Sequence, residues 1–157
     1  MNKRTILLGV VTAWVLTTTA FAADPIGVWL VAERTARISI VDCGGALWGV
    51  VSWEADPGGV DEKNPDPAKR SRPTLAMPVL LGMKASGPNQ WAGQIYNSQN
   101  GKTYAGRLTL ITPDVLYVRG CVFGIFCGGE NWTRAALTAA DQKLPEGATC
   151  SQPEPMR

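Results

Sequence analysis

The segment from residue 64 to residue 73 carries the side chains best suited to bind an anionic group. It reads Asn-Pro-Asp-Pro-Ala-Lys-Arg-Ser-Arg-Pro, so that Asp66 is followed closely by Lys69, Arg70 and Arg72. A guanidinium presents a planar fork of N–H donors that matches a carboxylate or a phosphate. We take Asp66, Arg70 and Arg72 as ligand-binding candidates. The competing interpretation is that they pair with one another and with backbone carbonyls to hold a proline-rich segment in place.

Two aromatic residues are the candidates for an apolar pocket. Trp91 and Tyr104 lie in neighbouring runs of alternating apolar and polar residues, and in each run the aromatic residue shares a strand face with a glycine, Gly93 or Gly106. If these faces point inward, the glycines leave space that larger side chains would fill. The alternative is a packed aromatic core, or a bulge at the glycines.

The absence of histidine restricts the chemistry that the chain can perform. With no histidine among 157 residues, Ser-His-Asp and Cys-His catalysis are excluded, and the commonest metal ligand is missing. Acidic residues such as Asp56, Asp61 and Glu62 crowd one segment instead of facing each other across a cleft, and such residues are usually solvated. We therefore expect no enzyme activity, no metal site and no cofactor.

The N-terminus has the pattern of an export signal. Lys3 and Arg4 precede an uncharged, largely apolar stretch that ends in Ala-Phe-Ala at residue 22. This order of basic, apolar and small residues predicts a signal peptide over residues 1–22, cleaved after Ala22, and hence a periplasmic or secreted protein. The apolar stretch is too short for a membrane anchor.

The charge balance argues against nucleic-acid binding. The chain has 15 basic and 13 acidic residues, and loss of Lys3 and Arg4 leaves 13 of each. Binding to phosphates or to an anionic membrane usually requires a basic surplus. We expect no nucleic-acid partner, no membrane span after cleavage, and one domain over residues 23–134 with a polar tail over residues 135–157.

The remainder of the chain is typical of an all-β fold. Short runs of β-forming residues alternate with Gly, Pro, Asn and Asp, as at Asn100-Gly101. Eight antiparallel strands joined mainly by hairpins can close into an up-and-down barrel, and an open sandwich is the alternative. The predicted strands are residues 26–33, 36–42, 46–54, 79–85, 90–96, 102–111, 114–121 and 129–134. The long proline-rich loop of residues 55–78 is predicted to cover one barrel mouth.

Several motifs, in order, resemble those of the bacterial domain-of-unknown-function family 2147. They are Gly27-x-Trp29, Cys43-Gly44-Gly45-x-Leu47, the 64–73 segment, Gly101-Lys102-Thr103-Tyr104-x-Gly106 and Trp132-Thr133-Arg134. The resemblance spans nearly all of the chain after the signal and implies an exported calycin or lipocalin-like barrel. It also implies that Trp29 packs under Arg134 as part of the fold, by a cation–π contact.

The four cysteines are predicted to form two disulfides, because an even number is typical of exported proteins. The family pattern has a second cysteine five residues after Cys43, and Trp48 stands there, which leaves Cys150 as a substitute partner. In an eight-strand meander Cys43 also lies at the opposite mouth from Cys121 and Cys127. We favour Cys43–Cys150 and Cys121–Cys127 among the three connectivities.

Two functional hypotheses remain. The first is a periplasmic binding module that holds a small apolar or amphipathic molecule in the barrel, with the long loop gating access. The second is an envelope protein with a filled barrel whose loop docks onto a protein partner. The volume of the interior separates the two.

Overall fold

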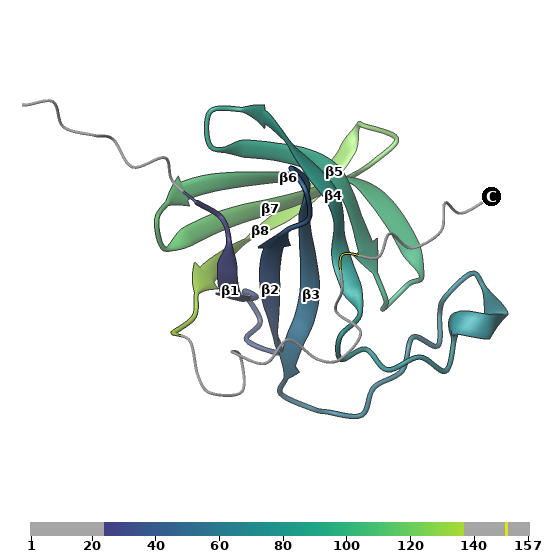
Figure 1. The fold of residues 1–157 in the computed structure, drawn as a ribbon. Coiled ribbons are helices and arrows are strands. Elements are labelled where there is room, and N and C mark those ends of the chain that lie inside the picture. The colour runs from purple at the N-terminus through teal and green to yellow at the C-terminus, as the bar shows by residue number, and fades with distance from the viewer. Residues whose placement is uncertain (1–23, 137–149, 151–157) are drawn as a thin grey trace, which may run out of the picture.

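The protein is a closed barrel of eight antiparallel strands (Figure 1). The computed structural model describes residues 24–136 and Cys150, so that the predicted signal peptide and most of the predicted tail lie outside the described residues. The all-β, up-and-down prediction is confirmed, and each predicted run overlaps one strand. The strands are β1 (Gly27–Leu30), β2 (Ala36–Asp42), β3 (Leu47–Glu54), β4 (Pro78–Gly87), β5 (Gln90–Asn97), β6 (Lys102–Thr112), β7 (Val115–Val122) and β8 (Phe126–Arg134).

Each strand pairs with its neighbours in sequence, and β1 closes the barrel against β8. The closing seam is short, because only Trp29 opposite Arg134 and Leu30 opposite Thr133 are paired. β8 therefore pairs with β1 only at its C-terminal end, and its residues 126–132 have no partner on β1. The described residues contain one further element, the 3-10 helix η1 (Pro67–Lys69), and no described helix has the length and apolar character needed to cross a bilayer.

One end of the barrel is closed by side chains from β1 and β8. The guanidinium of Arg134 lies 4.2 Å from the ring centroid of Trp29, which is fully buried. Arg134 also donates to the backbone oxygens of Ile26, at 2.9 Å, and Asp24, at 2.8 Å. Gly27 is required beside it, since a Cβ there would lie 2.7 Å from Nη1 of Arg134. The predicted cation–π contact is confirmed as a structural feature of this end.

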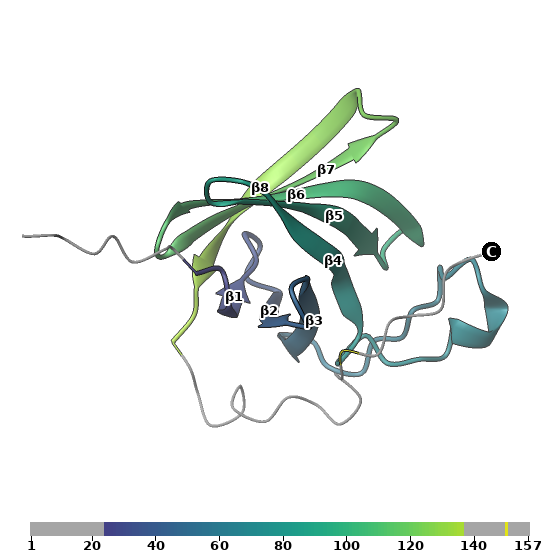
Figure 2. The same ribbon diagram turned by 45° about the horizontal axis from the view of Figure 1, so that its top comes forward.

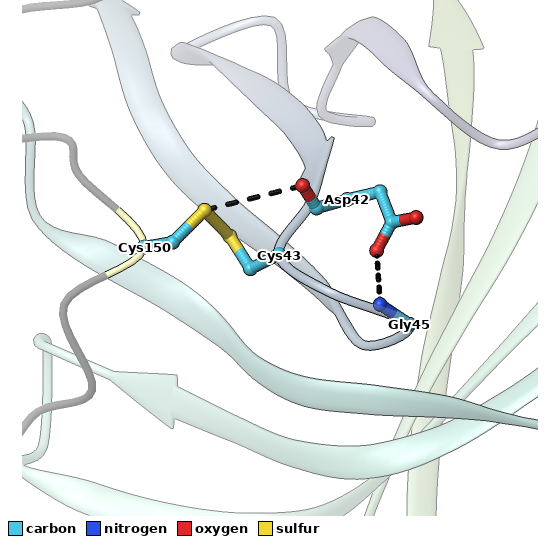
Figure 3. Close-up of a disulfide and its surroundings, with 4 residues drawn as sticks. All are labelled: Asp42, Cys43, Gly45 and Cys150. Atoms are coloured by element: carbon cyan, nitrogen blue, oxygen red, sulfur yellow. Dashed lines mark hydrogen bonds between the residues drawn. A yellow bond between two sulfur atoms is a disulfide. The ribbon is translucent and has the colours of Figure 1, made fainter.

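The two predicted disulfides are both present. Cys43 follows β2, and its bond to Cys150 attaches the C-terminal part of the chain to the β2–β3 turn (Figure 3). The same turn is stabilised where the Asp42 carboxylate accepts a hydrogen bond from the Gly45 backbone N–H, at 2.7 Å. The second bond joins Cys121 on β7 to Cys127, its direct partner on β8, near the opposite end of the barrel.

Candidate functional site

A pocket of about 420 Å³, broadly open to solvent, lies against the inner face of strands β5 to β8, at the end of the barrel away from Trp29 and Arg134. Strands β5 to β8 provide its walls, and on β5 and β7 every second residue faces it, as expected for the inner surface of a barrel. Phe126 and Glu130 face inward and yet remain exposed, so the pocket opens to solvent at this end. Its lining residues are Ile95, Asn97, Tyr104, Val118, Gly120, Val122, Phe126, Gly128, Gly129, Glu130 and Trp132.

Two glycines create much of this space. Gly120 on β7 and Gly128 on β8 are direct cross-strand partners. A Cβ at Gly128 would have no heavy atom within 4 Å, and one at Gly120 would make only an ordinary contact, 3.5 Å, with Tyr104 Cβ. Because neither position has a side chain, the part of the pocket wall that β7 and β8 form near their connecting turn is thin, and the pocket stays open there.

The glycines that the sequence suggested as cavity-forming, Gly93 and Gly106, have a different role. They are also cross-strand partners, but a Cβ at Gly106 would lie 2.5 Å from Ile95 Cγ1 and 2.8 Å from Met83 Cε. A Cβ at Gly93 would lie 2.7 Å from the Leu81 backbone oxygen. Met83 is fully buried and occupies the space above both glycines, so the cavity interpretation of this pair is wrong.

The two aromatic candidates lie on the same inner face but are not brought together. Tyr104 lines the pocket, and its hydroxyl accepts a hydrogen bond of 2.7 Å from Asn100 Nδ2 in the adjoining turn. Trp91 pairs with Leu108 further along the same two strands, where it is partly buried and packs against the core. Tyr104 is thus a pocket residue, whereas Trp91 is not among the residues that line this pocket.

The pocket contains one acidic side chain, which sequence reasoning missed. Glu130 lies among apolar lining residues, and its carboxylate accepts a hydrogen bond from the indole N–H of buried Trp132. The signal was available in the alternation of β8, since Phe126, Gly128, Glu130 and Trp132 occupy one face of that strand. A carboxylate held at the wall of an apolar pocket is a natural acceptor for a ligand's N–H or ammonium group.

The long loop between β3 and β4 was expected to cover a barrel mouth, and its contacts lie elsewhere. Tyr96 on β5 lies between two pocket-lining residues and therefore points to the outer face of the barrel. Its hydroxyl donates to Asp61 Oδ1 at 2.6 Å and accepts from Asn64 Nδ2 at 3.1 Å. No residue of this loop lines the pocket. The loop is therefore attached to the outside of the barrel.

The loop residues proposed as ligand-binding candidates stabilise this attachment. Arg72 donates to the Asp61 carboxylate, with Nη2 at 2.7 Å, and its guanidinium lies 5.5 Å from the ring centroid of Tyr96. Arg70 donates through Nε to the Asn64 backbone oxygen at 2.8 Å. Asp66 accepts from the Ala68 backbone N–H at the start of η1. The pairing interpretation is supported, but the acid that pairs with arginine is Asp61 rather than Asp66.

Asp61 departs from the expectation that the acids of this loop are solvated, because its side chain is fully buried. Its burial is compensated by three partners, the guanidinium of Arg72, the hydroxyl of Tyr96 and the amide of Asn64. The pKa of Tyr96 is raised to about 12, first because burial removes water from the phenolate, and next because its hydroxyl donates to the Asp61 carboxylate.

The comparison with protein families decides the classification. The family model described as an uncharacterized protein conserved in bacteria (DUF2147) matches residues 27–134, from the start of β1 to the end of β8. The chain belongs to this family. A comparison with curated proteins finds no significant match.

Among solved structures, the DUF2147 chain is similar to protein HP1028 from Helicobacter pylori, which is described as belonging to the lipocalin family. The two are 20% identical with a TM-score of 0.66, and the match covers 73% of this chain and 84% of that chain. At this identity the likeness concerns the fold, so the DUF2147 chain has a lipocalin-like barrel.

The lining of this DUF2147 pocket combines apolar side chains with a few polar groups. Apolar side chains from β5, β7 and β8 surround a single carboxylate, a phenol and an amide, so an amphipathic molecule could bury its apolar part and hydrogen-bond its head group. Among residues 24–136 and Cys150, no group of three potential ligating side chains is arranged to hold a metal ion.

Proposed function

We propose that this DUF2147 protein is a binding protein without catalytic activity, which holds a small amphipathic molecule in its barrel outside the cytoplasm. The observation that carries the proposal is the pocket of about 420 Å³, within the range of small-molecule sites. A filled interior would have favoured the alternative, an interaction protein with no ligand. The two disulfides support an oxidising compartment, in agreement with the export signal read from residues 1–22.

The polar groups of the pocket specify the kind of head group. Glu130 supplies a carboxylate, and neither an arginine nor a lysine is among the lining residues. An amphiphile with an ammonium or other N–H donor would gain a charge-assisted hydrogen bond there, whereas a fatty acid would place two carboxylates together. We therefore assign ligand binding to Tyr104, Glu130 and the apolar wall, and a structural role to Asp66, Arg70 and Arg72.

Binding is tested with two single-chain probes, dodecylamine and dodecanoate, by titration calorimetry on the purified disulfide-bonded protein. We expect dodecylamine to bind more tightly at neutral pH by about tenfold or more, which corresponds to one charge-assisted hydrogen bond. Glu130→Gln should remove that preference while the protein still binds an apolar chain. Equal affinities in the wild-type protein would contradict the assignment of Glu130.

The location of the site is tested by filling it. Gly128→Leu introduces an apolar side chain into open space and should abolish binding of both probes without unfolding the barrel. Asn131→Leu is the matched control, because residue 131 lies on the same strand with its side chain on the outer face, opposite Tyr117. Binding that survives Gly128→Leu would exclude this pocket. Native mass spectrometry of protein isolated from a periplasm would then show whether any natural ligand travels with it.

A further inference from the structure

The turn between β7 and β8 carries a concentrated group of exposed apolar side chains, which we call the apolar tip. It consists of Val122, Phe123, Ile125 and Phe126. They are four of the nine large apolar side chains that are exposed in the described part of the chain, and no other segment of five residues holds more than one of the remaining five. Phe123, Ile125 and Phe126 are 89%, 77% and 74% exposed, so this is a contiguous patch rather than scattered surface residues.

The apolar tip projects from the barrel. Figure 2 shows the β7–β8 hairpin extending beyond the ends of the neighbouring strands. The Cys121–Cys127 disulfide joins the two strands immediately behind the tip. Val122 and Phe126 are direct cross-strand partners, so strand pairing continues up to the turn. The hairpin is therefore stiff, and the turn does not fold back to bury its side chains. A rigid projecting element loses little conformational entropy when it docks.

The charge of the hairpin indicates what the apolar tip contacts. Residues 120–129 contain no charged side chain, so the tip offers neither ion pairs to an acidic or basic protein nor attraction to anionic head groups. The tip consists of only four apolar side chains on one turn, whereas a standard protein interface has about 20–30 residues on each side. Insertion of the same side chains at the boundary between the head groups and the acyl chains of a bilayer removes their apolar surface from water and requires no charge on the tip.

The apolar tip is continuous with the pocket. Val122 and Phe126 belong to both, since they line the pocket and are also exposed on the hairpin. Any surface into which the apolar tip inserts would therefore lie next to the open mouth of the pocket. Such an arrangement allows an amphiphile to pass between a lipid layer and the pocket with little exposure of its apolar chain to water.

We propose that the apolar tip docks the protein on an uncharged lipid surface and presents the pocket mouth to it. The inference rests on the proposed function in assigning a purpose to the docking, but the docking itself is measured separately. Binding is expected to depend on the tip's apolar side chains and to be insensitive to salt and to anionic lipid, because the tip carries no charge.

The experiment is flotation of the disulfide-bonded protein, beginning at Ala23 after removal of the predicted signal peptide, with phosphatidylcholine vesicles, with and without phosphatidylglycerol. Phe123→Asn combined with Ile125→Ser should weaken vesicle binding by about tenfold or more, as expected from loss of two inserted apolar side chains. Asn is chosen because residue 123 has a φ of 52°, a conformation that Asn tolerates. The matched control is Ile111→Ser, which removes an exposed apolar side chain near the β6–β7 turn, at the opposite end of the barrel.

Three results would overturn the proposal. They are unchanged flotation of the tip variant, flotation that requires phosphatidylglycerol or disappears in high salt, and a dimer that the tip variant dissociates without any vesicle binding. Dodecylamine titration of the tip variant in solution separates the two proposals. If the tip variant binds dodecylamine normally but no longer floats with vesicles, the result supports docking by the tip. If the wild-type protein floats with vesicles but does not bind dodecylamine, docking stands and the ligand-binding function is refuted.

Discussion

Two glycines on the inner surface of the barrel should respond in opposite ways to the same substitution. In Gly106→Ala the new methyl group would lie 2.5 Å from Ile95 Cγ1 and 2.8 Å from Met83 Cε, about 1 Å inside ordinary carbon–carbon contact. In Gly128→Ala the methyl group would meet nothing within 4 Å. Neither glycine has a positive φ, so backbone strain does not enter the comparison.

The expected magnitudes follow from these distances. Overpacking a filled interior costs about 1–3 kcal/mol, and the lower entropy of the unfolded chain with alanine returns about 0.5 kcal/mol. Gly106→Ala should therefore lower the free energy of unfolding by about 1–2 kcal/mol. Gly128→Ala should raise it by about 0.5 kcal/mol, since only the entropy contribution remains.

The assay is urea denaturation of the disulfide-bonded proteins, followed by tryptophan fluorescence, because the midpoint shifts with stability when the slope is unchanged. Ile95→Ala removes the side chain closest to the new methyl group. The double variant with Gly106→Ala should therefore lose about 1 kcal/mol less unfolding free energy than the two single variants lose together. Equal midpoints for Gly106→Ala and Gly128→Ala would refute the conclusion that Met83 fills one region and leaves the other open.

Three further predictions concern the long loop between β3 and β4 and the Cys43–Cys150 disulfide. Tyr96→Phe should lower the free energy of unfolding by about 1–3 kcal/mol at neutral pH, because buried Asp61 loses a hydrogen-bond donor. The pKa of Tyr96 in the folded protein is raised to about 12, so its protonated hydroxyl stabilises the folded state fully below pH 10. This stabilisation is lost as the pH rises toward 12. Comparing the alkaline denaturation of the wild-type protein with that of Tyr96→Phe isolates this loss. Asp61→Asn should cost about 2–3 kcal/mol in urea denaturation, whereas Asp66→Asn, on a side chain 46% exposed, should cost less than about 0.5 kcal/mol. Replacing both Cys43 and Cys150 by alanine should lower the free energy of unfolding by about 4–5 kcal/mol, because their disulfide spans 107 residues; a loss below about 1 kcal/mol would contradict the chain-entropy argument.

The barrel itself was predictable because its signals are local. Asn-Gly favours the positive φ angles found in tight turns, and Gly101 adopts one of 69° in the turn between β5 and β6. Strand alternation and the parity of successive turns also placed Cys121 and Cys127 at the opposite end from Cys43, and both predicted disulfides are present. These inferences need only the order of elements along the chain, not the positions of side chains.

The attachment of the long loop was predictable in principle. Assigning Ile95 and Asn97 to the inner face leaves Tyr96 outside, and a large aromatic residue on an outer face commonly has a partner that covers it. The choice among four loop acids was not available from the sequence. Burial of Asp61 depends on Asn64 and Arg72 reaching the same point from both sides of the loop, which only the folded chain shows.

The position of the pocket was not predictable, and the main reason is an irregularity in β4. Gly82 has a φ of 58°, and the β4–β5 register shifts between Leu81 and Lys84. This shift directs Met83 inward, where it fills the space at Gly93 and Gly106 that strand alternation alone would leave empty. Alternation identifies the inward-facing glycines on the regular strands. Whether such a glycine makes a cavity depends on the reach of a side chain from another strand. No such side chain reaches Gly128, and the pocket lies there.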